Sequence, residues 1–326
     1  MRFGFAVKIL GRPGLKSHDT RRWSAAADGP HLRVSIDCFR EILRYLDEAN
    51  IRMYRISSDF APYVTHPDMP WFRGQIDECL DELAEVGALA RGYGIRLSFH
   101  PSQYIVLNSP DEEIARHSIE DYKAQGRMLD AMGQGSEAVV VTHIGGVYGD
   151  RAGSMERFIS RCERLPGETR RRLVVENDDA SYSVADVLRV SRATGIPVVF
   201  DYLHHMNYNP GRLGIREAVE RSLATWPSGV QPKIHFSSPR TELREQRRKS
   251  RETGKMETVY LPPLLSQHSD YVNPYEFAMF VREVEGLPEF DVMLEAKAKD
   301  LALLRLREQL VAMGLPADTE AMLSIT

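Results

Sequence analysis

The residues best suited to chemistry stand where short apolar runs end. Residues 173–179 pass from Leu-Val-Val into acids, and Glu176 is the first polar residue after the run. A continuous apolar run bounded by polar residues is typical of a strand covered on both faces, so Glu176 is expected where that strand meets solvent. One such carboxylate is usually a helix cap or a satisfied loop acid. The pattern recurs, however, and the groups at or just past such ends are His66, His100, His143, Glu176, Asp201, His204, His235, His268 and Glu295.

The elements that must position these groups alternate regularly. Strands are expected at 2–9, 51–56, 95–99, 137–142, 172–175, 196–200, 230–236 and 290–294. Helical spacing of apolar residues is found between and after them, at 31–49, 71–93, 110–132, 155–165, 183–193, 212–226, 275–284 and 300–313. We therefore expect a (β/α)8 TIM barrel in one domain, residues 1–326, although the length would also fit two domains. In this fold the C-terminal ends of all strands converge on one face, where active sites are built.

A cluster of this composition predicts a metal site. So many imidazoles and carboxylates on one rim would repel one another or stay unpaired unless cations neutralised them. Imidazole and carboxylate without thiolate favour Zn²⁺, Mn²⁺, Fe²⁺ or Co²⁺ over Ca²⁺, and the groups are numerous enough for two or three ions. Such a site suits phosphoester hydrolysis, because divalent ions activate water and hold the phosphate. Glu176, nearest the middle of the barrel order, is the natural bridge between ions.

Composition places limits on the class of protein. The formal net charge is -4, so any polyanion must be bound by a local basic patch. The three cysteines are scattered without a CxxC pair, which argues against a disulfide framework or a thiolate zinc site. An apolar run begins within two residues of Met1, and no stretch approaches the roughly 18 apolar residues of a spanning helix. We expect a cytoplasmic monomer with no membrane segment and no obligate protein partner.

Three further features bear on the substrate. Lys233 and His235 share one face of a strand, and the lysine either pairs with Glu176 or Glu295 or takes part in the chemistry. Gln103 and Tyr104 follow His100, so they either fill a gap left when bases leave the stack or pack on a neighbouring loop. A basic segment after the seventh strand is either a solvated loop or a contact to a phosphate backbone, and its arginines include Arg240, Arg244, Arg247 and Arg248.

With these residues in view, the chain resembles the UV damage endonucleases, relatives of endonuclease IV within the xylose-isomerase-like TIM barrel superfamily. The matching motifs run in order from near residue 50 to near residue 300. They are YRISSD from Tyr54 with His66-Pro67, LSFHPSQY from Leu97, THIGG from Thr142, VEND from Val175, Phe200-Asp201 with His204-His205, PKIHFSS from Pro232, and MLEAK from Met293.

The resemblance implies a metal-dependent DNA repair endonuclease. It would nick duplex DNA 5′ to UV photoproducts and some abasic sites and leave a 3′-hydroxyl. Mn²⁺ is the ion expected, with Zn²⁺, Mg²⁺ and Co²⁺ as alternatives. The resemblance assigns metal ligation to all nine groups named above, catalysis to Glu176 and Lys233, and lesion probing to Gln103 and Tyr104. It also implies that Lys233 is carboxylated on its amine.

One position departs from the family pattern. Phe5 stands where relatives carry a tyrosine on the first strand, and it is expected at the lesion-facing end, where the missing hydroxyl would alter lesion preference. Two rival functions stay open. An abasic-site endonuclease of the endonuclease IV type would not need the Gln103-Tyr104 probe. A metal-dependent sugar isomerase would use the same barrel but bind its ions mostly through carboxylates.

Overall fold

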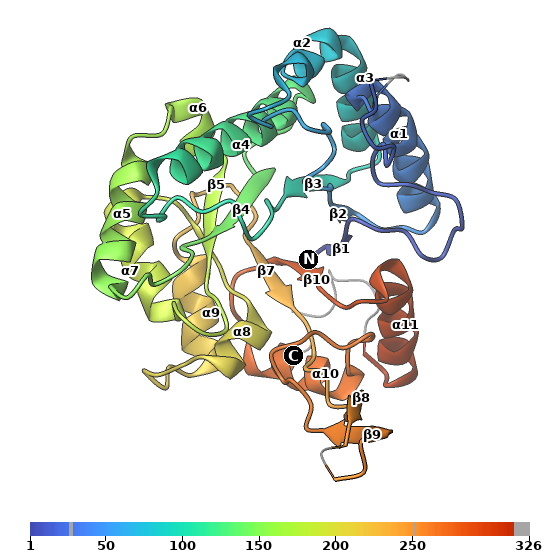
Figure 1. Cartoon of the computed structure of the whole chain (residues 1–326), viewed down its shortest axis with the longest axis vertical. Helices are drawn as coiled ribbons and strands as arrows, with labels where there is room; N and C mark the ends of the chain where they lie inside the picture. Colours follow the sequence, from blue (N-terminus) through green and yellow to red (C-terminus); the bar gives the residue numbers. More distant parts are fainter. Residues whose placement is uncertain (26–28, 251, 316–326) are drawn as a thin grey trace.

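The computed structural model describes residues 1–25, 29–250 and 252–315. Eight parallel strands form its main sheet, in the order β6-β5-β4-β3-β2-β1-β10-β7. The amide of His235 donates to the carbonyl of Phe200 at 2.8 Å, which joins β7 to the end of β6 and closes the ring. Figure 1 shows the helices around this ring. The strands are β1 (Phe3–Ala6), β2 (Met53–Arg55), β3 (Arg96–Phe99), β4 (Val139–His143), β5 (Leu173–Glu176), β6 (Val198–Val199), β7 (Lys233–Phe236) and β10 (Asp291–Leu294).

The fold is the predicted TIM barrel, and each predicted strand overlaps an observed one. The long outer helices are α1 (Leu32–Glu48), α3 (Leu80–Gly92), α4 (Glu112–Ala131), α5 (Arg151–Glu163), α7 (Val184–Thr194), α9 (Ile215–Leu223), α10 (Pro274–Glu283) and α11 (Lys299–Ala312). No helix within the described ranges is long and apolar enough to cross a membrane.

Local sequence explains where these helices begin and end. Ser183 and Asp186 form a capping box that starts α7, and Gly195 ends it with a φ of 76°, a left-handed conformation that glycine adopts without strain. Asp111 caps α4 by accepting from the amides of Glu113 and Ile114.

The prediction was wrong in three segments. The expected helix at 71–93 is interrupted, giving η1 (Pro70–Phe72), α2 (Gln75–Glu78) and α3. Buried Gln75 binds the backbone of Leu32, Pro62 and Phe72 at the first break, and Cys79, with a φ of -120° and a ψ of 22°, lies at the second. The expected loop after β6 contains α8 (Tyr202–Asn207), capped by Asp201. The basic segment after β7 is an antiparallel hairpin of β8 (Arg244–Lys249) and β9 (Met256–Leu261). Another short helix, α6 (Gly167–Arg170), was not predicted.

The side chains inside the barrel differ between its two ends, the floor at the N-terminal ends of the strands and the rim at their C-terminal ends. Its apolar centre is a small cluster of Val139, Val141, Val174, Val199 and Trp226. Charged side chains lie near the floor, where buried Asp291 accepts from Arg2 and Arg96. The rim, at the other end of the strands, carries the groups predicted to do chemistry. Because side chains alternate along each strand, the same strands that bury valines also aim polar groups inward at the rim.

Candidate metal centre

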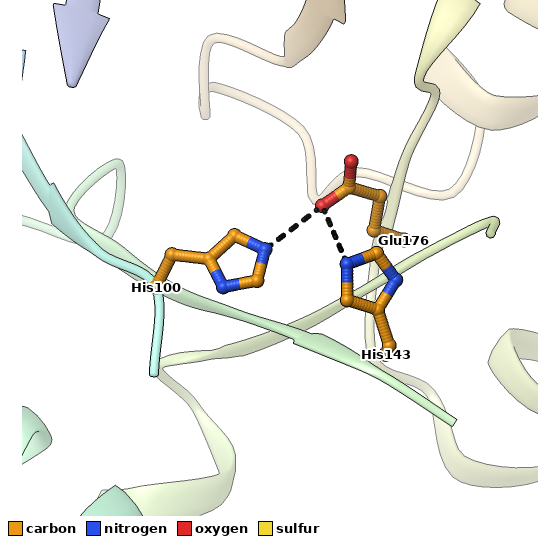
Figure 2. A group of neighbouring side chains, drawn as sticks. All are labelled: His100, His143 and Glu176. Atoms are coloured by element: carbon orange, nitrogen blue, oxygen red, sulfur yellow. Dashed lines mark hydrogen bonds and ion pairs between the residues drawn. The ribbon is translucent and has the colours of Figure 1, made fainter. Parts of the chain in front are cut away.

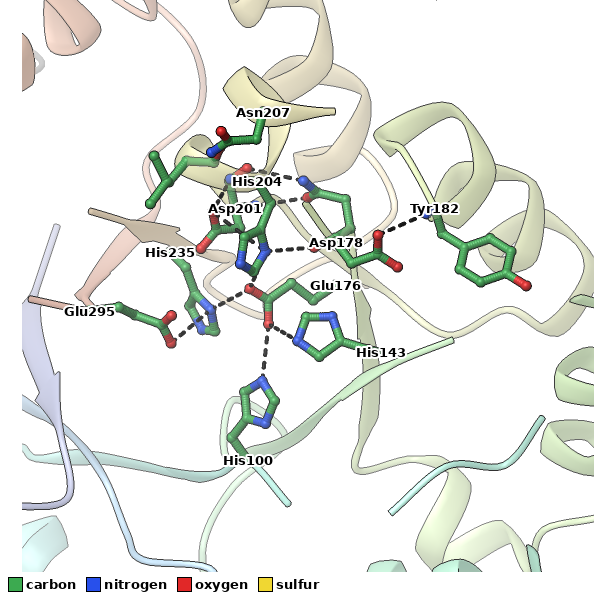
Figure 3. A network of polar contacts seen from close by, with 12 residues as sticks. His100, His143, Glu176, Asp178, Tyr182, Asp201, His204, Asn207, His235 and Glu295 are labelled. Atoms are coloured by element: carbon green, nitrogen blue, oxygen red, sulfur yellow. Dashed lines mark hydrogen bonds and ion pairs between the residues drawn. The ribbon is translucent and has the colours of Figure 1, made fainter. Parts of the chain in front are cut away.

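Glu176 lies at the centre of the rim. Its Oε2 is 3.2 Å from Nε2 of His100 and 3.6 Å from Nε2 of His143 (Figure 2). Its Oε1 is 2.9 Å from Nδ1 of His235 and 3.6 Å from Nδ1 of His204 (Figure 3). Each oxygen of one buried carboxylate therefore faces its own pair of imidazoles. Glu176 is thus placed where it could serve as a ligand shared by two groups of donor atoms.

Two groups of donor atoms share Glu176. His100, His143 and Glu176 form the first, and Glu176, Asp201, His235 and Glu295 form the second, with the donor atoms of each group within 4.8 Å of one another. These residues come from β3, β4, β5, β6, β7 and β10 or the positions just after them. The barrel thus brings together six of the nine predicted groups, and His204 and His268 lie beside them.

Hydrogen bonds fix three of the histidine rings in a metal-ready orientation. Nδ1 of His100 lies 3.0 Å from the carbonyl of Pro101, Nδ1 of His204 lies 2.9 Å from that of Asn177, and Nδ1 of His268 lies 2.5 Å from that of Glu295. A neutral imidazole that donates Nδ1–H to a carbonyl has its Nε2 lone pair free, the usual state of a metal ligand.

Unpartnered buried atoms test whether the residues fit a metal. Within the described part of the chain, Nδ1 of His143, Oδ2 of Asp201 and Nε2 of His235 are buried without a hydrogen-bond partner. Leaving buried polar atoms unpaired is costly, and so many at one site call for a ligand. The donor set of imidazoles and carboxylates fits divalent transition ions, so the residues could hold a metal.

The ionisable groups at the rim differ in the direction in which their pKa values are shifted. Burial lowers the pKa of His100 to about 4, whereas the carboxylates of Asp201, Glu176 and Glu295 overcome burial and raise the pKa of His204 to about 9. Burial would raise the pKa of Glu176, but the imidazoles of His235, His143 and His100 hold it well below its usual range. The rim therefore places an ionised Glu176 beside a neutral His100, the states in which both can bind a metal, whereas His204 keeps its proton near neutral pH and must lose it to become a ligand.

Lys233 is fully buried on β7 below His235, and within the described residues its Nζ has no hydrogen-bond partner. The alternative that it pairs with Glu176 or Glu295 is therefore wrong. Burial, followed by the nearby Arg96 and Arg55 cations, holds the pKa of this amine well below its usual range. A neutral buried amine is a nucleophile rather than a counter-ion.

Two residues of the site were not identified from the sequence. Arg55, at the end of β2, donates through Nη1 to Oε1 of Glu295. Asn177 exchanges hydrogen bonds with the backbone of Asp201, at 2.9 and 3.1 Å, and its carbonyl binds His204. Arg55 and Asn177 each lie inside a quoted motif, directly after Tyr54 and Glu176. Their place in these motifs was the signal that could have identified them.

His66 is not brought to the two groups. Its Nδ1 accepts from the amide of Asp68 at 3.2 Å, and its ring lies 6.0 Å from that of Tyr63. A neutral ring that accepts at Nδ1 carries its proton on Nε2, so His66 differs from the metal-ready histidines. His268 lies closer, with Nδ1 3.9 Å from Oε2 of Glu295 and its ring 6.3 Å from that of His204.

An apolar cavity of about 530 Å³ adjoins the candidate metal centre. His100 and His143 form one wall, and the loop with Gln103 and Tyr104 forms another. The Tyr104 side chain is 76% exposed, which removes the alternative that it packs on a neighbouring loop. A larger groove, of about 680 Å³, lies along α4 away from the rim, and charged residues there such as Lys123 and Arg127 are ion-paired.

The expectation for Phe5 was wrong. Phe5 has no exposed surface and packs edge to face on Tyr54 at 5.5 Å. Phe3, two residues earlier on the same face of β1, packs on Phe277 of α10. Side chains two apart on a strand share a face, so Phe5 points between the sheet and the helices rather than toward the rim. It has no surface with which to stack on DNA.

The basic hairpin joins the barrel beside the metal centre. Pro239 pairs with His268 at its base, and the amide of Arg240 donates to Gln267. Figure 1 shows β8 and β9 projecting from the barrel. Alternation puts Arg244 and Arg248 on one face of β8 and Arg247 on the other, so the arginines cannot all meet one surface.

Sequence comparison gives relatives over most of the chain. The UV-endonuclease UvdE family matches residues 33–315. A UV DNA damage endonuclease of Bacillus velezensis is 35% identical over 273 residues, which cover 83% of this chain and 78% of the relative. One of Bacillus cereus (strain G9842) is 31% identical over 295 residues, covering 90% and 86%.

Structure comparison agrees. The crystal structure of SacUVDE superposes with a TM-score of 0.78 at 30% identity and covers 96% of this chain and 99% of its own. A D-psicose 3-epimerase in the presence of D-fructose superposes with a TM-score of 0.51 at 13% identity, covering 91% and 85%. The second likeness shows the shared barrel alone.

Proposed function

The chain belongs to the UV-endonuclease UvdE family, and from this premise we propose that it nicks damaged duplex DNA by a metal-dependent reaction at its rim. Membership makes it a DNA-cleaving hydrolase of UV damage repair. The finer proposal is that it cuts 5′ to UV photoproducts, and at some abasic sites. Water attacks phosphorus, the bond to the 3′ oxygen breaks, and that oxygen leaves as a 3′-hydroxyl.

The observation that carries the proposal is the position of Glu176 between two pairs of imidazoles. The residues proposed to hold two or three ions, Mn²⁺ first among the candidates, are His100, His143, Glu176, Asp201, His204, His235, His268 and Glu295, with His66, which lies outside the two donor groups, as the ninth. Bound divalent ions would supply an activated water and positive charge beside the phosphate. Burial of Glu176 and Asp201 keeps bulk water from competing for these donors.

Lys233 is proposed to be carboxylated. Its neutral amine adds to the carbon of CO2 and releases a proton, which gives a carbamate with one negative charge. The negative charge of the carbamate would be balanced by Arg96 and Arg55, the two cations that lower the pKa of Lys233. Carbon NMR of protein equilibrated with isotope-labelled bicarbonate should show a carbamate signal that Lys233→Ala lacks. A parent spectrum identical to that of the variant would contradict the proposal.

Gln103 and Tyr104 are proposed to enter the duplex at the lesion. Both side chains are exposed beside His100 and next to the apolar cavity. An aromatic ring and an amide can replace the stacking and pairing of displaced bases. Tyr104→Ala should therefore lower nicking of damaged duplex while the bound metal content stays that of the parent.

Cleavage of three matched duplexes tests the function. The metal-loaded protein is incubated with undamaged, abasic and UV-irradiated DNA of one sequence, and the cut position is mapped. We expect a nick just 5′ of the photoproduct and an intact undamaged strand. Cutting of the abasic duplex alone would place the protein with endonuclease IV instead. No cutting of any duplex would contradict the proposal and favour the sugar isomerase alternative.

A further inference from the structure

One arc of the rim carries three cations in addition to the metal-ligand candidate Glu295. Strands β2, β1 and β10 are neighbours in the sheet. Arg55 is the last residue of β2, Lys8 lies two residues past the end of β1, and Lys299 begins α11 after β10. Figure 1 shows α11 beside these strands. The three cations therefore follow adjacent strands, next to Glu295.

The charges of this arc influence one another. Burial, then the Arg55 and Lys8 cations, lower the pKa of Lys299. Arg55 binds Glu295, but in the described ranges neither Lys8 nor Lys299 has a carboxylate within ion-pair distance. Partly buried Arg55 and Lys299 and exposed Lys8 thus share one nearby carboxylate, and such an excess of positive charge favours the binding of an anion.

The backbone is strained at Val7, which precedes Lys8, and at Lys299. Val7 has a φ of 66°, and the amide of Lys8 donates to the carbonyl of Ala6 at 2.9 Å. These features describe the positive-φ form of a γ-turn, which is rare and strained, above all for a β-branched residue. Lys299 has a φ of 54°. Strain of this kind persists only where the surroundings enforce it, and it clusters at functional sites.

Specific hydrogen bonds enforce both conformations. The amide of Val7 donates to the carbonyl of Arg55 at 2.9 Å, and the Tyr54 hydroxyl donates to the carbonyl of Val7. Asp300, which follows Lys299, accepts from the amides of Leu10 and Gly11 at 2.8 Å each. The segment that carries Lys8 is thus fastened to β2 on one side and to α11 on the other.

We propose that Lys8, Arg55 and Lys299 form an anion site, the cationic corner, that holds one backbone phosphate of the bound DNA. The assignment rests on the proposed function for the identity of the anion. Contacts to phosphate fix the position of a duplex without reading its sequence. A phosphate held here would lie beside Glu295 and orient the strand across the metal centre.

The test measures the salt dependence of DNA binding by the full-length protein. Fluorescence anisotropy is recorded with undamaged duplex and metal-loaded protein, and with irradiated duplex in chelator, so that no strand is cut. Lys8→Gln and Lys299→Gln remove one charge each. Glutamine has the same restriction on φ as lysine, so the strain is unchanged. Lys123→Gln, on α4 and away from the rim, is the matched control.

Each corner variant should lower the slope of log K against log salt by about one, since each phosphate contact contributes roughly that amount. The control should keep the parent slope. A lower slope on either duplex supports the corner. Slopes equal to those of the parent on both duplexes would overturn it. If the parent fails to nick any DNA but the slopes still fall, the proposed function fails and the anion site stands.

Discussion

At the scale of single residues, Glu176 determines what the rim can do. Both of its oxygens are within 3.6 Å of two imidazoles each, and its side chain is 1% exposed. A buried carboxylate surrounded in this way links two donor groups that would otherwise be separate. Removing its charge should therefore disturb both groups at once.

Glu176→Gln should lower nicking of irradiated duplex by about 100-fold or more, because removing even an outer partner of a metal ligand typically costs about 10–100-fold. Bound metal measured by elemental analysis should fall with it. Glu113→Gln, an exposed position on α4, should change neither quantity. Full metal content together with full activity in Glu176→Gln would contradict the role of this carboxylate.

The raised pKa of His204 predicts a pH effect on the metal-free protein. Its pKa is raised to about 9 from an ordinary value near 6.5. The native state therefore holds the proton more tightly, and the added stability is complete below pH 6.5 and lost as pH rises through about 9. The expected size is on the order of 3 kcal/mol.

The measurement compares urea unfolding of the parent and His204→Gln in chelator from pH 6 to pH 10. Buried Lys233 has a lowered pKa and changes stability in the opposite direction over this range, so only the difference between the two proteins isolates His204. The difference should shrink as pH rises. Parallel curves would show that His204 does not hold its proton in the native state.

The sequence was sufficient to predict which residues could bind a metal, but not the direction in which every side chain points. Glu176, His100 just after β3 and His143 at the end of β4 were predicted because a strand end fixes their place on the rim. Phe5 was assigned to the wrong face of β1. This strand has only four residues and all are buried, so the sequence alone does not show which of them point into the barrel. The Nδ1 bonds that prepare His100, His204 and His268 depend on loop carbonyls that no spacing reveals.

At the scale of elements, the basic hairpin differs most from expectation. Residues 244–249 are all polar, without apolar alternation, so the sequence predicts a loop, yet β8 and β9 pair over six residues each. The strand register divides the cations of β8 between the two faces of the hairpin. Arg244 donates to the carbonyl of Pro262, and Arg248 lies 3.7 Å from Glu257. On the opposite face, Arg247 and Lys249 have no ion pair among the described residues.

The face with Arg247 and Lys249 should therefore contribute more to DNA binding. Arg247→Gln combined with Lys249→Gln should lower the salt slope by about two. Arg244→Gln combined with Arg248→Gln should lower it less, because those side chains already have partners. Anisotropy titrations of all variants with one duplex give the comparison. The reverse ranking would assign the other face to the DNA.

At the scale of the whole molecule, charge at the barrel floor holds the strands that carry the rim. Asp291 accepts from the amide of Arg2 at 2.7 Å, from Nε of Arg2 at 2.9 Å and from Nη1 of Arg96 at 2.7 Å. Arg96 and Asp291 are both buried. This network ties β10 to β3 and to the start of β1, across the interior of the barrel.

Asp291→Asn should lower the free energy of unfolding by about 3–5 kcal/mol, because it leaves the buried Arg96 cation without a carboxylate. Asp37→Asn, on the exposed side of α1, is the control and should stay near the parent value. Denaturant unfolding gives both values. Nicking at low temperature should survive in Asp291→Asn. Unchanged stability would mean that the floor network does not support the barrel.

The strand and helix alternation was sufficient to predict the barrel, because parallel strands buried on both faces give apolar runs that end sharply. The floor network was not predicted, because Arg2, Arg96 and Asp291 lie far apart in the chain and inside expected strands. Interior charge is brought together only when the ring closes.

The most direct test of the central claim is single-turnover nicking of irradiated duplex by chelated protein, before and after Mn²⁺ is added back. We predict an intact strand in chelator and, after Mn²⁺, a cut 5′ of the photoproduct with a 3′-hydroxyl end. Nicking at the same rate in chelator would contradict a metal-dependent reaction at the rim.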